Sequence, residues 1–513
     1  MKSLRSQFNE TLEYMNSPDI KPPGAEPAVE THNSEGDRTR APRRWWTLPA
    51  VSAAQLLVVL DGTIVNIALP SAQSALGMSD ASRQWAITAY ALTFGGLLLI
   101  GGRVSGALGH RRTFIIGLVG FAASSALGGA AVNPGMLFGA RALQGVFAAA
   151  LAPAGLSLLT TTFTDPRERG RAFGVFAAVG AAGSALGLVT GGLLTEYASW
   201  RWCLYINVPI ALCAVLGTAV VPADRPIRGG GRLDVAGALL SAAGFGAVVY
   251  AFNEAEPLGW GSPKVSALLV GGVLLLAAFA AVEVRAQHPL LPMRVLLHRA
   301  RAGSLVSITL MFVAMFGFYL FMSYYTQTVL GYSPVQAGLT LLINALAALL
   351  GSTLLTGRLH GRVPPAMLIL PGLVAAAAGM LVLTRLTPQS AHVLPLYLVP
   401  ALVLTGLGLG SVITSTAGLA TADVAPYDIG AASAAYNASQ QLGAALGTAL
   451  LNTIATSAAA SYLASEGHAT PTGASVHGYT TALMVGFGIL LAAVCLTAPL
   501  IRTRAARPPS PRP

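Results

Sequence analysis

Residues 56–70 read LLVVLDGTIVNIALP, an apolar run with a single charged residue, Asp61. Together with its apolar flanks the run is long enough to cross a bilayer as a helix, which takes about 20 residues. A charge at membrane depth costs roughly 3 kcal/mol on insertion scales, and such residues usually serve a function. Asp61 is therefore the first candidate for a functional residue. The alternative is a carboxylate that is paired inside a helix bundle for structure alone.

The composition is that of a membrane protein. Of the 513 residues, 54% are hydrophobic and 10% are charged, whereas soluble proteins carry about 25% charged residues. The three cysteines, Cys203, Cys213 and Cys495, all lie in apolar segments and read as small hydrophobic residues. We expect no metal and no cofactor.

Apolar segments of spanning length recur along the chain, and we predict an all-α membrane protein with 14 transmembrane helices. Their approximate limits are 47–70, 84–104, 113–133, 135–162, 169–194, 202–221, 233–253, 264–284, 302–325, 334–357, 366–386, 393–416, 430–458 and 479–501. An even number of spans places both termini on one side of the membrane.

The distribution of basic residues predicts which side that is. Lys and Arg number 26 on the side of the termini and four on the other side, so both termini are expected in the cytoplasm. The same asymmetry explains the net charge of +11 without a nucleic-acid partner. Arg outnumbers Lys 28 to 3, a bias of GC-rich genomes that favours a bacterial source and hence the inner or plasma membrane.

A repeat predicts the domain organisation. Residues of the fifth span and its approach recur 260 positions later, in the thirteenth span and its approach: Pro166, Gly170, Gly183 and Gly187 match Pro426, Gly430, Gly443 and Gly447. Repeated halves around a midplane site are typical of secondary transporters. We therefore expect a disordered cytoplasmic tail (1–44), a six-helix bundle (45–222), a linker with two extra transmembrane helices (223–300), a second six-helix bundle (301–501) and a cytoplasmic tail (502–513).

Several short motifs carry a family resemblance. They are LDGTIVNIALP at 60–70, RALQG at 141–145, WRW at 200–202, INVP at 206–209 and RLD at 232–234. Over roughly residues 45–501 the chain resembles the fourteen-span drug:proton antiporters of the major facilitator superfamily. The resemblance implies the major facilitator fold and the export of small, often amphipathic or cationic compounds, driven by proton entry.

Two motifs depart from the family pattern. The loop after the second span usually carries an acid and a base where this chain has Gly106 and Ala107, and the antiporter motif of the fifth span usually has a proline at the place of Leu188. The loss of the acid puts the usual latch of the cytoplasmic gate in doubt. We expect the loop arginines to meet acids elsewhere, with Asp165 and Glu168 nearest in sequence. The gating and packing candidates that remain are Gly102, Arg103, Gly109, Arg111, Arg112, Gly183, Gly187 and Gly191.

The positions of Asp61 and Arg141 along their helices predict that the acid and the base lie at a similar depth in the membrane. At 1.5 Å per residue, Asp61 lies ~20 Å from the cytoplasmic end of a ~30 Å core, and Arg141 lies ~9 Å in from the outer end. The two residues therefore fall at similar heights and are candidates for proton coupling. Burial favours the protonated acid, whereas a nearby guanidinium favours the carboxylate. The alternative for Arg141 is an arginine that reaches toward the outer interface.

Other polar residues within spans are candidates for the substrate cavity, since substrate pockets combine apolar walls with a few polar groups. They are Gln55, Asn66, Gln144, Asn207, Tyr319, Tyr324, Gln327, Asn344, Asn437 and Gln440.

These observations predict a proton-driven exporter of small organic compounds, of the antibiotic or multidrug efflux type, that works as a monomer by alternating access. One alternative is proton-coupled uptake of a small metabolite, because both directions use the same cycle. Another is a membrane-embedded sensor or enzyme on the same fold. No paired acids or nucleophile–base set occur in the spans, so we do not expect an enzyme.

Overall fold

The structure is a computed structural model that describes residues 45–78, 85–219, 234–286, 289–359, 363–387, 389–425, 428–465 and 470–501. The expected tails, 1–44 and 502–513, and the first part of the expected linker, 223–233, lie outside the described residues. So does the side chain of Asn66, one of the cavity candidates.

All regular elements of the described part are helices. The first group is α3 (Thr47–Leu76), α5 (Trp85–Leu108), α6 (His110–Gly129), α7 (Pro134–Thr162), α8 (Pro166–Tyr197), α9 (Trp202–Tyr205) and α10 (Asn207–Thr218). Next come α11 (Val235–Leu258), α12 (Pro263–Arg285) and α13 (Met293–Leu297). The last group is α14 (Arg299–Tyr324), η1 (Tyr325–Val329), α15 (Pro334–Leu350), η2 (Gly351–Thr356), α16 (Gly357–Leu359), α17 (Ala366–Leu383), η3 (Leu394–Leu398), α18 (Val399–Thr421), α19 (Ile429–Ser465) and α20 (Pro471–Ile501).

Eleven of the described helical segments are long and apolar enough to cross a membrane, and two shorter apolar helices, 202–218 and 236–252, accompany them. The chain is therefore a multi-pass membrane protein. Burial separates helices inside the fold from helices at its edge: 67% of the apolar window of α7 is buried, against 17% for α12. The outward face of α12 is consequently available to lipid.

Capping residues fix the starts of several helices. Asn133 accepts a hydrogen bond from the backbone N–H of Met136 before α7, and Asp165 accepts from the N–H groups of Arg167 and Glu168 before α8. Ser333 and Gln336 form a reciprocal capping box before α15. Each cap satisfies N–H groups that have no partner within the helix.

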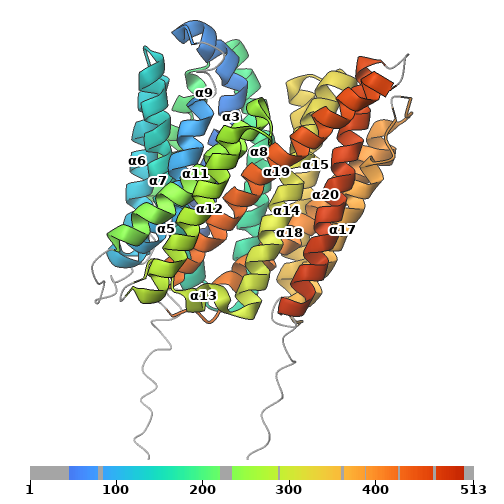
Figure 1. Cartoon of the computed structure of the whole chain (residues 1–513). Coiled ribbons are helices and arrows are strands. Elements are labelled where there is room, and N and C mark those ends of the chain that lie inside the picture. The colour runs from blue at the N-terminus through green and yellow to red at the C-terminus, as the bar shows by residue number, and fades with distance from the viewer. Residues whose placement is uncertain are drawn as a thin grey trace, which may run out of the picture. The chain divides into compact units, whose positions relative to one another are not determined.

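The helices form two groups, called bundles below, which also pack on each other through α8 against α15 and α5 against α19 (Figure 1). In the first, α7 packs against α5 and α6, and α3 packs against α8 and α10. In the second, α14 packs against α19 and α20, and α18 packs against α15 and α17. Between them in sequence, α11 packs against α5, α12 and α19. Helix α11 thus contacts both groups, and α12 packs on α11.

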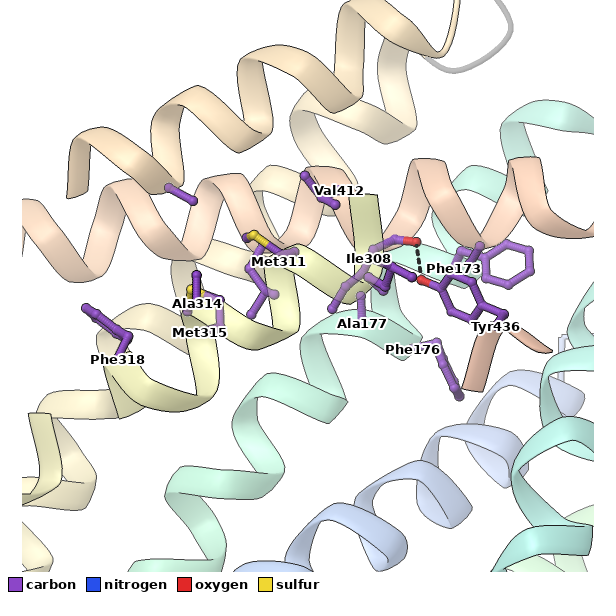
Figure 2. Packing of buried hydrophobic residues seen from close by; sticks show 14 of the residues in the cluster. Phe173, Phe176, Ala177, Ile308, Met311, Ala314, Met315, Phe318, Val412 and Tyr436 are labelled. Carbon is purple, nitrogen blue, oxygen red and sulfur yellow. Dashed lines mark hydrogen bonds between the residues drawn. The ribbon is translucent and has the colours of Figure 1, made fainter. Parts of the chain in front are cut away.

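Apolar side chains of both bundles meet in one buried cluster, part of which is shown in Figure 2. Phe173 and Ala177 of α8 belong to it together with Met311 of α14 and Tyr436 of α19. The hydroxyl of Tyr436 donates to the carbonyl oxygen of Ile413 at 3.2 Å. The two bundles therefore share an apolar core.

Polar contacts between the bundles occur at the end where α3 begins and α20 ends, called the terminal end below. Ser157 of α7 donates to Ser433 of α19 at 3.1 Å, and Ser352 of η2 donates to the backbone oxygen of Gly174 at 2.9 Å. Gly102 of α5 lies directly against Gly430: a Cβ on Gly102 would be 2.5 Å from the Gly430 carbonyl oxygen. Helices that touch through their backbones hold the terminal end closed.

Candidate functional site

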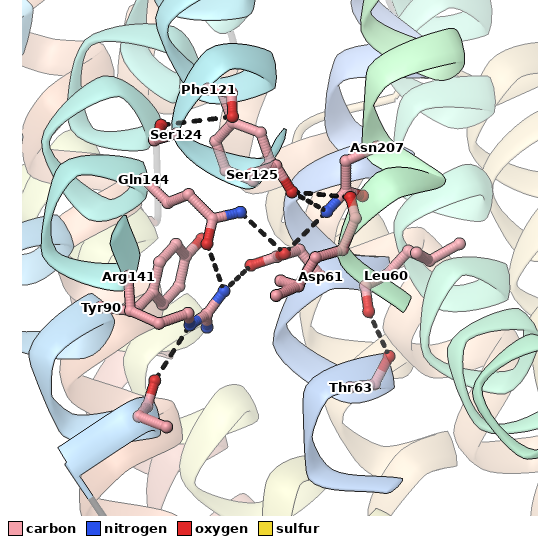
Figure 3. A network of polar contacts seen from close by, with 12 residues as sticks. Leu60, Asp61, Thr63, Tyr90, Phe121, Ser124, Ser125, Arg141, Gln144 and Asn207 are labelled. Carbon is pink, nitrogen blue, oxygen red and sulfur yellow. Dashed lines mark hydrogen bonds and ion pairs between the residues drawn. The ribbon is translucent and has the colours of Figure 1, made fainter. Parts of the chain in front are cut away.

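Asp61 lies on α3 and is fully buried, with 0% of its surface exposed. Its Oδ2 forms an ion pair with Nη1 of Arg141 at 2.6 Å. Its Oδ1 accepts hydrogen bonds from Nε2 of Gln144 at 3.1 Å and from Nδ2 of Asn207 at 2.8 Å (Figure 3). Three donors from α7 and α10 thus converge on one carboxylate.

Arg141 is held independently of Asp61. Its Nε donates to the backbone oxygen of Ala86 at 2.9 Å, and its Nη1 also donates to Oε1 of Gln144 at 2.9 Å. Its guanidinium lies 4.5 Å from the centre of the Tyr90 ring, within reach of a cation–π attraction. Arg141 and Gln144 are three residues apart on α7, so they share one face of that helix.

The helical hydrogen-bond pattern is interrupted at Ile206, just before Asn207. Pro209 lacks the N–H that would bond to the carbonyl of Tyr205 in a continuous helix, and α9 ends at Tyr205 while α10 starts at Asn207. Pro209 itself falls in the first turn of α10, where it is tolerated. The motif INVP therefore places the Asn207 side chain at the start of a helix, with its amide directed at Asp61 (Figure 3).

This arrangement suits a carboxylate that gains and loses a proton. A buried ion pair is stable only with good geometry and further hydrogen bonds, and the side chains around Asp61 provide both. The charges of Asp61 and Arg141 cancel, so protonation of Asp61 leaves an uncompensated positive charge. Because Asp61 is fully buried in this conformation, a proton could reach it only if the surrounding helices moved.

The structure thus brings together four of the residues proposed from sequence: Asp61, Arg141, Gln144 and Asn207. Gln144 and Asn207, expected in the substrate cavity, are both 0% exposed and bind Asp61. Sequence reasoning missed two members of the network, Tyr90 and Ser125. Both are polar residues within predicted spans, which is the rule that selected the other candidates.

The other cavity candidates lie apart from Asp61. In the second bundle, Tyr319 donates to Oδ1 of Asn344 at 2.8 Å, and Asn344 in turn donates to Thr405 at 2.8 Å. Asn437 bonds to its own helix, through the carbonyl of Ser433. Of the remaining four, Gln55 lies near Gly180 and Gln327 bonds to Ser323. Gln440 bonds to Tyr436, and Tyr324 is 45% exposed.

The glycines of the fifth predicted span, now α8, face α3. A Cβ on Gly183 would lie 3.1 Å from Val59, and one on Gly191 would lie 3.0 Å from Ile64. At Gly187 a Cβ would overlap the hydroxyl of Thr63. This face of α8 is therefore a surface of close helix packing, and it supports the helix that carries Asp61.

The loop after α5 has acids near it, but they come from far along the sequence. The charges that act on Arg103 are those of Asp428, just before α19, and Glu283, on α12. Asp428 is 2% exposed and also pairs with Arg294 at 2.8 Å. Asp165, by contrast, caps α8, and Arg111 donates to the backbone oxygen of Thr218 at 3.1 Å. With Gly106 in place of an acid, a base on α5, Arg103, still lies within the electrostatic influence of an acid next to α19, Asp428.

Replacing Asp428 is expected to loosen the terminal end. In an Asp428→Asn variant, Arg103 and Arg294 lose their shared acid. We expect Ser433→Cys, in a background without native cysteines, to react about tenfold faster with a maleimide, as for a loss of about 1.4 kcal/mol of closure energy. Glu254→Gln is the matched control, because Glu254 belongs to a partly exposed ion pair with Lys264. Equal labelling rates in Asp428→Asn and its parent would argue against the role of Asp428.

Comparisons with known proteins agree with this architecture. Residues 51–448 match the family model described as Major Facilitator Superfamily. The puromycin resistance protein pur8 of Streptomyces alboniger is 55% identical over 465 residues, which are 90% of this chain and 92% of that protein. The cephamycin export protein CmcT of Amycolatopsis lactamdurans is 40% identical over 405 residues, 78% of this chain and 83% of that protein.

Among solved structures, the proton:xylose symporter XylE matches with a TM-score of 0.62 at 15% identity, and the match covers 90% of this chain and 96% of XylE. A likeness at this level of identity concerns the fold alone. The family model and the two relatives, by contrast, match most of the sequence. This chain belongs to the major facilitator superfamily.

Proposed function

We propose that this protein exports small, amphipathic organic compounds of the antibiotic type across the bacterial plasma membrane, in exchange for protons and as a monomer. The observation that carries the proposal is the buried Asp61–Arg141 pair with its two amide donors. The names of the relatives support export: one is a puromycin resistance protein and another a cephamycin export protein. Members of the superfamily are transporters, not enzymes.

The proposed cycle follows from the chemistry of the pair. In an outward-facing state Asp61 takes a proton, and the ion pair with Arg141 opens. In an inward-facing state Arg141 returns to Asp61 and drives the proton into the cytoplasm. A cationic substrate competes with the proton for the same negative charge. Alternating access then needs only that the terminal end and the opposite end open in turn.

We also propose fourteen spans with both termini in the cytoplasm, and two six-helix bundles (45–222 and 301–501) joined by a linker with two extra helices (223–300). The eleven long apolar helices support this count. The two shorter apolar helices and the 32-residue helix α8 occupy the positions of the remaining predicted spans.

Drug susceptibility tests the proposed direction of transport. Expression of the protein in a susceptible bacterial host should raise the inhibitory concentration of its substrates, with puromycin and a cephamycin as the first compounds to try. The same host with Asp61→Asn at equal expression is the control. Increased sensitivity on expression would favour the alternative, proton-coupled uptake.

A reporter fusion tests the topology. Alkaline phosphatase is active only outside the cytoplasm, whereas green fluorescent protein folds in it. A fusion after residue 501 should therefore be fluorescent with green fluorescent protein and inactive with the phosphatase. A fusion in the loop between α11 and α12, after Gly261, should give the opposite result and serves as the control. Phosphatase activity after residue 501 would contradict the assignment.

A further inference from the structure

We propose that the two carboxylate oxygens of Asp61 have separate roles: Asn207, together with Gln144, holds Oδ1 in place throughout the cycle, and Oδ2 alone binds and releases the proton. Asn207 is then a positioning residue for proton exchange. This inference rests on the proposed function of Asp61 as the proton carrier, and it adds which atom exchanges the proton and what orients it.

Oδ1 of Asp61 has two neutral donors. It accepts from the amide nitrogens of Asn207 at 2.8 Å and Gln144 at 3.1 Å. Neither donor is charged, so both bonds can persist when the carboxylate becomes a neutral acid, because the carbonyl oxygen of an acid also accepts hydrogen bonds. Oδ1 therefore has the environment of a carbonyl oxygen in both protonation states.

The Asn207 amide is held in one orientation. Its Nδ2 also donates to Oγ of Ser125 at 2.9 Å, and that hydroxyl donates its own proton to the backbone oxygen of Leu204 at 2.8 Å. Ser125 Oγ can consequently only accept from Asn207, and an ionised carboxylate can only accept as well. Both amide hydrogens are thus engaged, whereas Oδ1 of Asn207 has no hydrogen-bond partner among the described residues. Two acceptors fix the amide with its nitrogen toward Asp61 (Figure 3).

Oδ2 of Asp61, unlike Oδ1, has a charged partner. Among the described residues, its partner is the Nη1 of Arg141 at 2.6 Å. Arg141 has other contacts that keep it near once this bond opens: the Ala86 carbonyl, Oε1 of Gln144 and the Tyr90 ring. The Tyr90 hydroxyl is buried and has no hydrogen-bond partner in the described part of the chain, so it is an acceptor within reach of a displaced guanidinium.

A hydronium ion transfers its proton to Oδ2: one O–H bond of the hydronium breaks, an O–H bond to Oδ2 forms, and a water molecule leaves. The contact between Oδ2 and Arg141 opens. Arg141 keeps its charge, so the site changes from neutral to +1, and Oδ1 becomes the carbonyl oxygen with both amide donors in place. Among the described residues, the titratable groups that face Asp61 from the surrounding helices are Arg141 and Tyr90; its other partners, Gln144 and Asn207, are neutral.

The test uses the full-length protein in vesicles with three variants. Asn207→Leu removes one of the two amide donors to Oδ1 at similar volume, and Ser125→Ala removes the acceptor that orients Asn207 together with the donor to the Leu204 carbonyl. Thr63→Val is the matched control, because the Thr63 hydroxyl on the same helix bonds to the carbonyls of Val59 and Leu60. The two readouts are the pH midpoint of proton-coupled transport and the infrared C=O band of protonated Asp61, assigned as the band missing from Asp61→Asn.

A donor stabilises a carboxylate more than a neutral acid. Asn207→Leu should therefore move the midpoint up by about one pH unit, the size expected for one hydrogen bond to a charged group. It should also move the C=O band to higher wavenumber, because the carbonyl loses a donor. Ser125→Ala should shift both in the same direction by less, and Thr63→Val should shift neither.

The outcomes separate this inference from the proposed function. If Asp61→Asn is inactive but Asn207→Leu leaves the midpoint and the band unchanged, the division of roles between the two oxygens is wrong while the proton carrier stands. If Asp61→Asn transports normally with protons, the proposed function itself fails. If Asn207→Leu does not fold, Ser125→Ala decides by the same two readouts.

Discussion

Asp61→Asn is expected to reduce substrate-driven proton movement in vesicles to background while the protein remains folded and membrane-inserted. The amide has the shape of the carboxylate, and its oxygen can still accept from Arg141. Arg141 also keeps its bonds to Ala86 and Gln144, so the fold does not depend on Asp61 alone. An amide cannot bind and release a proton in the physiological range, and the exchange therefore stops.

The measurement is the change in internal pH of vesicles after addition of a substrate, with a pH-sensitive dye and the wild-type protein at equal density. Asp61→Glu is measured as a second variant, because it keeps the acid but moves it by one methylene group. We expect this variant to retain part of the proton exchange. Folding is checked by size-exclusion profile and thermal unfolding in detergent. Proton exchange at the wild-type rate in Asp61→Asn would remove Asp61 from the mechanism.

The helices were largely predictable, because runs of apolar residues long enough to cross a membrane can be recognised in the sequence. The predicted spans fall on the helices of the structure, from α3 to α20. The sequence did not predict the break between α9 and α10, although Pro209 was visible, since a proline in an apolar run can also be accommodated by a kink. The position of α11 against both α5 and α19 depends on packing between segments far apart in the chain, which hydropathy does not report.

At the candidate site, the sequence predicted how deep in the membrane the residues lie, but not in which direction their side chains point. Counting residues along two helices placed Asp61 and Arg141 at the same height, and the two form an ion pair. Whether Gln144 and Asn207 point at that pair or into an open cavity depends on the rotation of each helix about its axis. A polar residue in an almost uniformly apolar helix gives little information on that rotation. The partners of Arg103 were unpredictable for a similar reason, because Asp428 lies more than 300 residues away in sequence.

Arg141→Ala is expected to have two large effects that separate structure from mechanism. Removing one partner of a buried ion pair typically costs about 3–5 kcal/mol, because the remaining charge is left uncompensated. Asp61 can avoid this cost by taking up a proton, so any remaining transport should reach its pH midpoint at a higher pH than in the wild type. The sign is clear, since loss of a nearby positive charge favours the neutral acid.

A double variant separates the two effects. Asp61→Asn combined with Arg141→Ala removes both charges, so thermal unfolding in detergent should recover much of the stability that Arg141→Ala loses, while proton exchange stays absent. The difference between the double variant and the sum of the single ones measures the coupling of the pair. If Arg141→Ala leaves the pH profile of transport unchanged and only lowers the unfolding temperature, Arg141 serves the fold, and Asp61 must be tuned by Gln144 and Asn207 alone. A shifted profile together with restored stability in the double variant would show that the buried pair is retained for proton coupling, since an uncharged pair then suffices for the fold.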